Sequence, residues 1–198
     1  MFRFLLILIF QFSMVSIAHA EALESLLTSE QVQITGVQGR GASSGASLTG
    51  TLTNRTGSTI KVDAVMLEPI YFDNAGSAQN MVATQVYGSG GAYYLDGTRR
   101  YIELSPHESM QVLFIAYCAD FERDNPGYSD ALHTAPMPYR IASVARKIAE
   151  YEASNPDVDT VAPAQLALWL SQGVTPDQIR EQFNFDQEDL ENARSILR

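Results

Sequence analysis

Cysteine is almost absent from this sequence, in which Cys118 is the only one among 198 residues. A single thiol excludes an intramolecular disulfide, because that bond needs two cysteines in one chain. In an oxidising compartment a lone thiol is buried, bonded to another molecule, or used chemically. The role of Cys118 is therefore one of the main questions that the sequence raises.

The familiar signatures of catalysis are also missing. The chain contains no HExxH, CxxC, Walker or GxSxG pattern, which removes the recognisable zinc protease, P-loop and serine hydrolase mechanisms. Asp120, Glu122, Asp124 and Asp130 offer the oxygen ligands that calcium prefers, but they follow no calcium-loop spacing, so a solvated acidic surface is the favoured interpretation. We expect no metal and no cofactor, and a binding role rather than an enzymatic one.

Positive charge is scarce. Lys61 and Lys147 are the two lysines, and 13 basic residues face 23 acidic ones, for a formal net charge of -10. A field of this sign repels phosphate backbones and anionic lipid headgroups. Nucleic acid is therefore excluded as an expected partner, and a protein or another surface ligand remains.

Long apolar runs are absent beyond the N-terminus, where residues 4–10 form an unbroken one after Arg3. Ala18 and Ala20 then supply the small residues of a signal peptidase site, so residues 1–20 read as a signal peptide cleaved after Ala20. Polar residues interrupt the run before it reaches the ~18 apolar residues of a membrane anchor. We expect a mature chain without a membrane span, exported to the periplasm, the cell surface or the medium.

The mature chain changes character near residue 137. Before it, apolar and polar residues alternate between Gly, Ser, Thr and Asn turns, which favours short strands at 32–35, 47–53, 59–67, 81–87, 101–104 and 109–117. Both faces of 109–117 are apolar, so it should be a central strand, in a hairpin with 101–104. Six or seven such strands predict an antiparallel β-sandwich of the immunoglobulin-like kind.

Helical spacing follows. Ile141, Val144 and Ile148 lie on one stripe of a helix at 139–152, Thr175 with Gln178 forms a capping box, and further helices begin near residues 163 and 186. The expected fold is therefore α+β. It comprises a signal peptide (1–20), a β-sandwich (21–118), an acidic connector (119–137) and a small helical bundle (138–198).

One pair of residues suggests a specific chemistry. A cysteine thiolate can attack a glutamine amide, expel ammonia and leave an internal thioester that captures amines. Cys118 ends the most apolar predicted strand, and Gln165 stands in the first turn of a predicted helix, four residues before Trp169 and on the same face. The end of a strand beside the start of a helix is a suitable place for such a pair.

The windows around these residues resemble the two motifs of thioester domains, the adhesive modules of Gram-positive surface proteins. Tyr117-Cys118-Ala119-Asp120 satisfies the first motif, and residues 164–168 with Trp169 next satisfy the second except at Leu166. The resemblance implies a β-sandwich joined to a helical part. It also implies that Cys118 and Gln165 form the bond and that the module captures surface amines covalently.

Three other interpretations stay open. Cys118 is also typical of a buried inert thiol in a structural protein, with Gln165 at a helix start and Trp169 in the core. Cys118 and His133 are the thiol and imidazole of a small cell-envelope enzyme, although their spacing matches no nucleophile signature. An intermolecular disulfide through Cys118 is the third.

Overall fold

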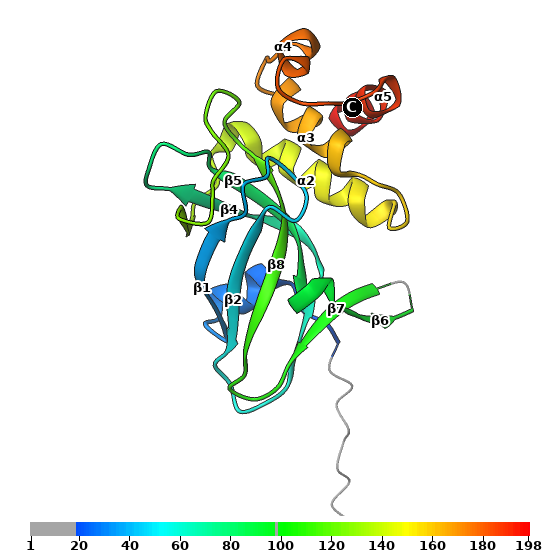
Figure 1. Cartoon of the computed structure of the whole chain (residues 1–198). Coiled ribbons are helices and arrows are strands. Elements are labelled where there is room, and N and C mark those ends of the chain that lie inside the picture. Colours follow the sequence, from blue (N-terminus) through cyan, green and yellow to red (C-terminus); the bar gives the residue numbers. More distant parts are fainter. Residues whose placement is uncertain (1–18, 98) are drawn as a thin grey trace, which may run out of the picture.

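The fold is built around a closed barrel of six antiparallel strands, seen in a computed structural model that describes residues 19–97 and 99–198. The strands follow one another around the barrel in the order β1-β2-β8-β5-β4-β9 (Figure 1). Their bounds are β1 (Val32–Gly39), β2 (Leu48–Asn54), β4 (Val65–Asn74), β5 (Met81–Gly88), β8 (Ser109–Cys118) and β9 (Ala131–Ala135). The predicted signal peptide falls almost entirely on residues 1–18, which lie outside the described residues.

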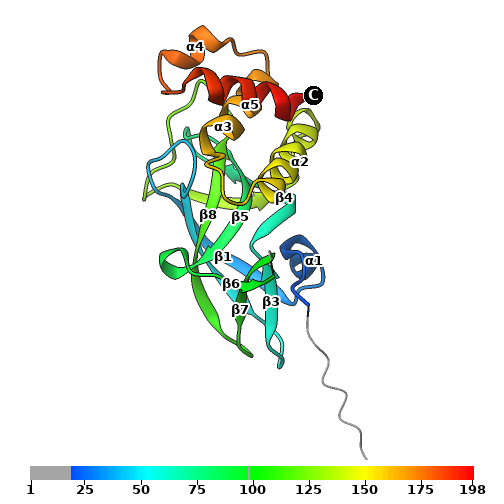
Figure 2. The same cartoon turned by 90° about the vertical axis from the view of Figure 1, so that its right-hand side faces the viewer.

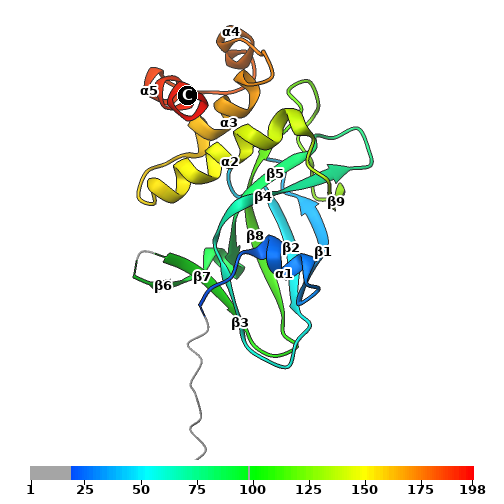
Figure 3. The ribbon, with the colours of Figure 1, turned by 180° about the vertical axis from the view of Figure 1, so that it is seen from behind.

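A second sheet of three strands stands beside the barrel in the order β3-β7-β6. Its members, with a short 3-10 turn before β6, are β3 (Ile60–Asp63), η1 (Ser89–Gly91), β6 (Tyr94–Asp96) and β7 (Arg99–Leu104). The chain enters this sheet by a bridge between Glu21 and Val62. In Figure 3 the β6–β7 ribbon projects sideways from the barrel wall.

Most of the helices gather over one end of the barrel, whereas α1 (Leu23–Thr28) packs low on its wall (Figure 2). The others are α2 (Tyr139–Ser154), α3 (Val161–Leu170), α4 (Pro176–Arg180) and α5 (Gln187–Leu197). The predicted capping box of Thr175 with Gln178 is confirmed, and the helix predicted to begin near residue 186 is α5, which Asp186 caps. These local signals work because a cap needs only its own turn of helix.

The predicted immunoglobulin-like sandwich is wrong, because the strands close into a barrel. Closure depends on β9, which lies inside the segment 119–137 that was expected to be an acidic connector. β9 pairs with β4 on one side, where His133 is opposite Asp73, and with β1 on the other, where Leu132 is opposite Val37. A five-residue strand with one buried apolar side chain, Leu132, leaves almost no periodic signal in the sequence.

The pairing of the middle strands also differs from the prediction. β8 is central, as predicted, since it pairs with β2 and β5. It forms no hairpin with β7, which pairs instead with β3 and β6. The single strand predicted at 59–67 is divided at Ala64, with β3 in the small sheet and β4 in the barrel.

Side chains fill the interior of the barrel, and the segment after β8 packs closely against the barrel. Phe72 of β4 and Phe114 of β8 meet in the interior with ring centroids 5.3 Å apart. Gly39, the last residue of β1, lies directly against this segment. Only glycine allows this close approach, because a Cβ at Gly39 would lie 2.0 Å from the Pro126 carbonyl oxygen. Gly41 donates to that same oxygen at 2.9 Å. The supposed connector is therefore packed onto the barrel.

A search of residues 19–97 and 99–198 for a helix of sufficient length and hydropathy to cross a lipid bilayer finds none.

Candidate functional site

Cys118 and Gln165 meet in the structure, where the last residue of β8 touches the first turns of α3. Both residues are completely buried. The Cys118 N–H donates to Gln165 Oε1 at 2.9 Å, and Gln165 Nε2 donates to the Cys118 carbonyl oxygen at 3.0 Å. The glutamine amide thus pairs with the cysteine main chain as a neighbouring strand would, and it ties the helices to the barrel.

The Cys118 thiol has different neighbours from the Cys118 main chain. Its sulfur lies 3.6 Å from Met81 Sδ and 3.5 Å from Asn125 Oδ1. Burial, and to a lesser extent the carboxylate of Asp120, raises the pKa of this thiol far above its ordinary value. The thiol is therefore protonated at neutral pH and is a poor nucleophile.

The other residues singled out by sequence have separate places. Trp169 is a core residue, edge-on to Phe121 and Phe183 at centroid distances of 5.2 and 5.6 Å. His133 is exposed on β9, and the hydrogen bonds of Cys118 within the described chain do not include it. The structure therefore brings Cys118 to Gln165 and not to His133. Tyr117 is buried and belongs to a second feature, described next.

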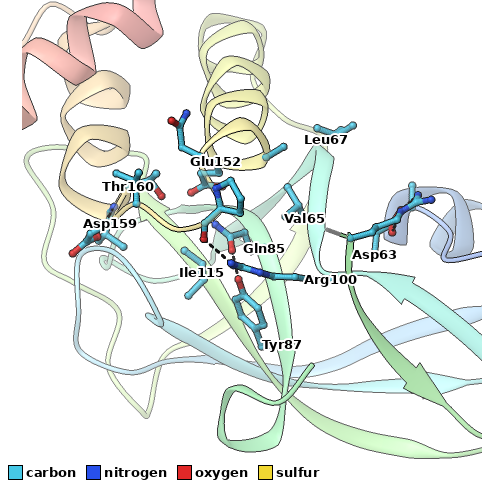
Figure 4. Close-up of a pocket in the computed structure, with 17 residues that line it drawn as sticks. Asp63, Val65, Leu67, Gln85, Tyr87, Arg100, Ile115, Glu152, Asp159 and Thr160 are labelled. Carbon is cyan, nitrogen blue, oxygen red and sulfur yellow. Dashed lines mark hydrogen bonds and ion pairs between the residues drawn. The ribbon is translucent and has the colours of Figure 1, made fainter. Parts of the chain in front are cut away.

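A cavity of about 540 Å³ lies between the barrel wall, the small sheet and the turn from α2 to α3. Figure 4 shows side chains from β4, β5, β7 and β8 around it, with the end of α2 above. Val65, Leu67 and Ile115 form an apolar wall, and Gln85, Tyr87 and Arg100 bring polar groups. Cavities of roughly 300–1,000 Å³ with this mixed lining are typical small-molecule sites.

Glu152 lines the inner part of this cavity and is only 3% exposed. It lies four residues after Ile148, on the apolar stripe that packs α2 against the barrel. The Tyr117 hydroxyl donates to Glu152 Oε1, whereas Oε2 has no hydrogen-bond partner among the residues that the structure describes. The cavity therefore contains a buried carboxyl with one oxygen unused.

Burial also changes the acidity of Glu152. It raises the pKa of the carboxyl, and the polar groups of Tyr117, Thr84 and Gln85 oppose this rise without cancelling it. Thr84 Oγ1 is a second buried polar atom without a hydrogen-bond partner in the described chain. An unused buried acceptor costs roughly 1–3 kcal/mol, so a donor supplied to Glu152 from outside would be bound favourably.

The mouth of the cavity carries paired charges. Arg100 donates to the Pro156 carbonyl oxygen at 2.5 Å, lies 3.9 Å from Asp157 Oδ1 and stacks over the Tyr93 ring. Arg99 Nε donates to Asp63 Oδ1 at 2.6 Å. These contacts hold the small sheet and the α2–α3 turn together around the opening.

Tyr87 connects the mouth to the interior. Its hydroxyl donates to Gln85 Oε1. Burial raises the pKa of Tyr87, and Arg100 lowers it in part. Because Gln85 also influences the pKa of Glu152, a continuous line of polar side chains runs from the rim to the buried carboxyl.

Sequence reasoning did not identify this site. Its residues come from five strands, from α2 and from the turn into α3, and they meet only after the barrel closes. One signal was present: Glu152 lies in phase with the apolar residues of its helix, where a charged side chain is rarely found.

A larger hollow of about 730 Å³ beside α1 and β9 is lined by none of the buried unpaired polar atoms found in the described residues.

No group of three or more histidine, cysteine, aspartate or glutamate side chains is placed to hold a metal ion within residues 19–97 and 99–198. Comparisons of the chain with protein-family models, with curated proteins and with solved structures found no match.

Proposed function

We propose that this chain is an exported binding protein that holds a small ligand, or a protruding group of a larger one, in the cavity beside Glu152. The observation that carries the proposal is the unpartnered Glu152 Oε2 on the wall of a 540 Å³ cavity. Buried polar atoms are nearly always hydrogen-bonded in folded proteins. A ligand donor placed in the cavity would supply the missing partner.

The lining favours binding over catalysis. The described residues around the cavity include no histidine, cysteine or serine, so the common pairing of a serine or cysteine nucleophile with a histidine base is not assembled there. The apolar wall of Val65, Leu67 and Ile115 suits the body of a ligand, and the few polar groups suit its orientation. A non-enzymatic module is therefore the best-supported reading.

The covalent version of the proposal is supported less well. Cys118 and Gln165 are adjacent, but both polar atoms of the Gln165 amide already bond to the Cys118 main chain. The thiol is directed to Met81 and Asn125 and has a raised pKa. We propose that the pair is a structural clamp and that ligand binding is non-covalent.

Ligand-detected NMR with a library of small soluble compounds tests the proposed site. Val65→Phe narrows the cavity from the β4 wall, and Thr35→Phe places the same ring on the exposed face of β1 as a matched control. We expect compounds that bind the wild type to bind the Thr35→Phe variant equally and to be lost with Val65→Phe. Equal binding to both variants would place the site elsewhere.

Export is tested separately by sequencing the N-terminus of the mature protein from its native host. Glu21 is the expected first residue, because cleavage after Ala20 is predicted. Recovery of the intact N-terminus from the cytoplasm would contradict the exported part of the proposal.

A further inference from the structure

Acidic side chains outnumber basic ones around the cavity. Three acidic side chains line it, Asp63, Glu152 and Asp159, together with Arg99 and Arg100. Both arginines are engaged at the mouth, Arg99 with Asp63 and Arg100 with the Pro156 carbonyl oxygen and, more distantly, Asp157. No ion pair to Glu152 is found in the part of the chain that the structure describes.

We propose that the ligand of this cavity is an organic cation: a primary or secondary ammonium group carried on an aliphatic chain. The inference rests on the proposed function and names the ligand chemistry of the same site. Glu152 Oε2 would accept one ammonium N–H and supply the opposite charge. Buried charges are tolerated where they are paired, so ligand and carboxylate stabilise one another.

A second acceptor lies beside the first. Gln85 Oε1 accepts from the Tyr87 hydroxyl and retains a free lone pair, because a carbonyl oxygen accepts two hydrogen bonds. Gln85 is close enough to Glu152 to influence its acidity, and Figure 4 shows the two side chains at the same inner wall. An ammonium group has several donors, so its bond to Glu152 Oε2 would leave further N–H groups for other acceptors on this wall.

The rest of the lining suits an aliphatic chain. Val65 and Ile115 flank the inner part of the cavity, and Leu67 and Val158 continue the apolar surface to the mouth, where each is more than half exposed. An anionic ligand would instead meet the Glu152 carboxyl without a neutralising group beside it. A neutral ligand would pair with the oxygen but would not stabilise the ionised form of the buried carboxyl.

An ammonium can come from two sources, a free alkylamine or the lysine side chain of a protein partner. Isothermal titration calorimetry with n-hexylamine, n-hexanol and hexanoate compares a cation, a neutral isostere and an anion on wild-type protein. Nα-acetyl-lysine methylamide then represents the lysine source. We expect n-hexylamine to bind at least about tenfold more tightly than n-hexanol, and hexanoate to bind more weakly than either.

Variants of α2 assign the effect to one carboxyl. Glu152→Gln keeps the shape of the side chain and removes its charge, and Glu150→Gln makes the same change on the exposed face of the same helix. The first should weaken n-hexylamine binding about tenfold or more, which corresponds to about 1.4 kcal/mol. The second should leave it unchanged.

Proton release gives a second readout. An ammonium near Glu152 lowers the pKa of a carboxyl that burial raises. The other titratable or charged groups around it are Tyr117, Tyr87, Arg99, Arg100, Asp159 and Asp63, and n-hexanol controls for their response. Titration at a pH below the pKa of Glu152 in the free protein, in buffers of different ionisation enthalpy, should show protons released by n-hexylamine and none by n-hexanol.

The outcomes separate the two proposals. If n-hexanol binds as tightly as n-hexylamine and Val65→Phe abolishes both, the cavity is a binding site and the cation inference is wrong. If no compound binds the wild type in a Val65-dependent manner, the proposed function fails as well. The wild-type series decides between cation and neutral ligand even if Glu152→Gln does not fold. Tighter binding of the lysine derivative would identify a protein partner as the source.

Discussion

Replacing Gln165 by leucine should lower the free energy of unfolding by about 2–3 kcal/mol, because it removes the amide while keeping most of the side-chain volume. The Cys118 carbonyl oxygen then loses its donor at 3.0 Å, and an orphaned buried acceptor costs roughly 1–3 kcal/mol. The Cys118 N–H loses Gln165 Oε1 but keeps the Ser43 carbonyl oxygen at 3.0 Å. The lost bond from the Cys118 N–H to Gln165 Oε1 contributes roughly 0.5–1 kcal/mol, because the same N–H also bonds to Ser43.

Urea denaturation followed by circular dichroism measures this loss, and a thermal scan should show a fall in Tm of about 4–12 °C for a chain of this size. Gln172→Leu is the matched control, since Gln172 follows α3 and is half-buried, with one hydrogen bond to the Leu168 carbonyl oxygen at 3.1 Å. It should cost less than about 1 kcal/mol. Equal effects of the two substitutions would refute the clamp.

Cys118→Ala separates the clamp from a thioester. The substitution removes the sulfur and leaves both main-chain bonds to Gln165, so it should cost about 1–2 kcal/mol less than Gln165→Leu. A thioester needs both side chains, so its loss would make the two variants equally destabilised. It would also make the intact wild-type protein lighter by one ammonia. Either result would overturn the structural reading of the pair.

The remaining predictions concern acidity, thiol reactivity and packing. Because burial raises the pKa of Glu152, the folded state binds the carboxyl proton more tightly than the unfolded state does. The free energy of unfolding should therefore fall as the pH rises from about 4.5 through the folded pKa. Glu152→Gln should flatten this fall in urea titrations, and an unchanged dependence of the free energy on pH would contradict the assignment. Cys118, with its raised pKa, should react with a disulfide reagent only as fast as the protein opens, and labelling at the rate of a free thiol would show that it is not buried. Gly39→Ala should cost about 1–3 kcal/mol or more because of the backbone of Pro126, whereas Gly57→Ala, with open space around its Cβ, should be nearly neutral in thermal melts; equal melting temperatures would mean that the segment after β8 does not press on the barrel.

Local features were predictable where they depend on neighbours in sequence. The capping box at Thr175 and the cap at Asp186 are satisfied within one turn, so a short motif is enough to locate them. The two apolar faces of β8 correctly indicated a strand with partners on both sides. These signals require no knowledge of which distant strand lies opposite.

Strand partners were not predictable in the same way. β8 was expected to pair with β7, its nearest neighbour in sequence, but β2 and β5 are its partners. β9 was hidden in an acidic segment, and its short length offers no period to detect. Because a β-pair is selected by the burial of both strands together, either strand alone leaves the choice open.

The sequence by itself determined the lone thiol, the acidic charge and the identity of the two residues at the junction of strand and helix. It even suggested that Cys118 and Gln165 would meet. Only the tertiary structure decided what each atom does: the amide bonds to the main chain, and the thiol is directed to Met81 and Asn125. It alone also placed Glu152 on a cavity wall. The chemistry of a side chain is a property of its residue, whereas its hydrogen-bond partners and its exposure to solvent are set by segments distant in the chain.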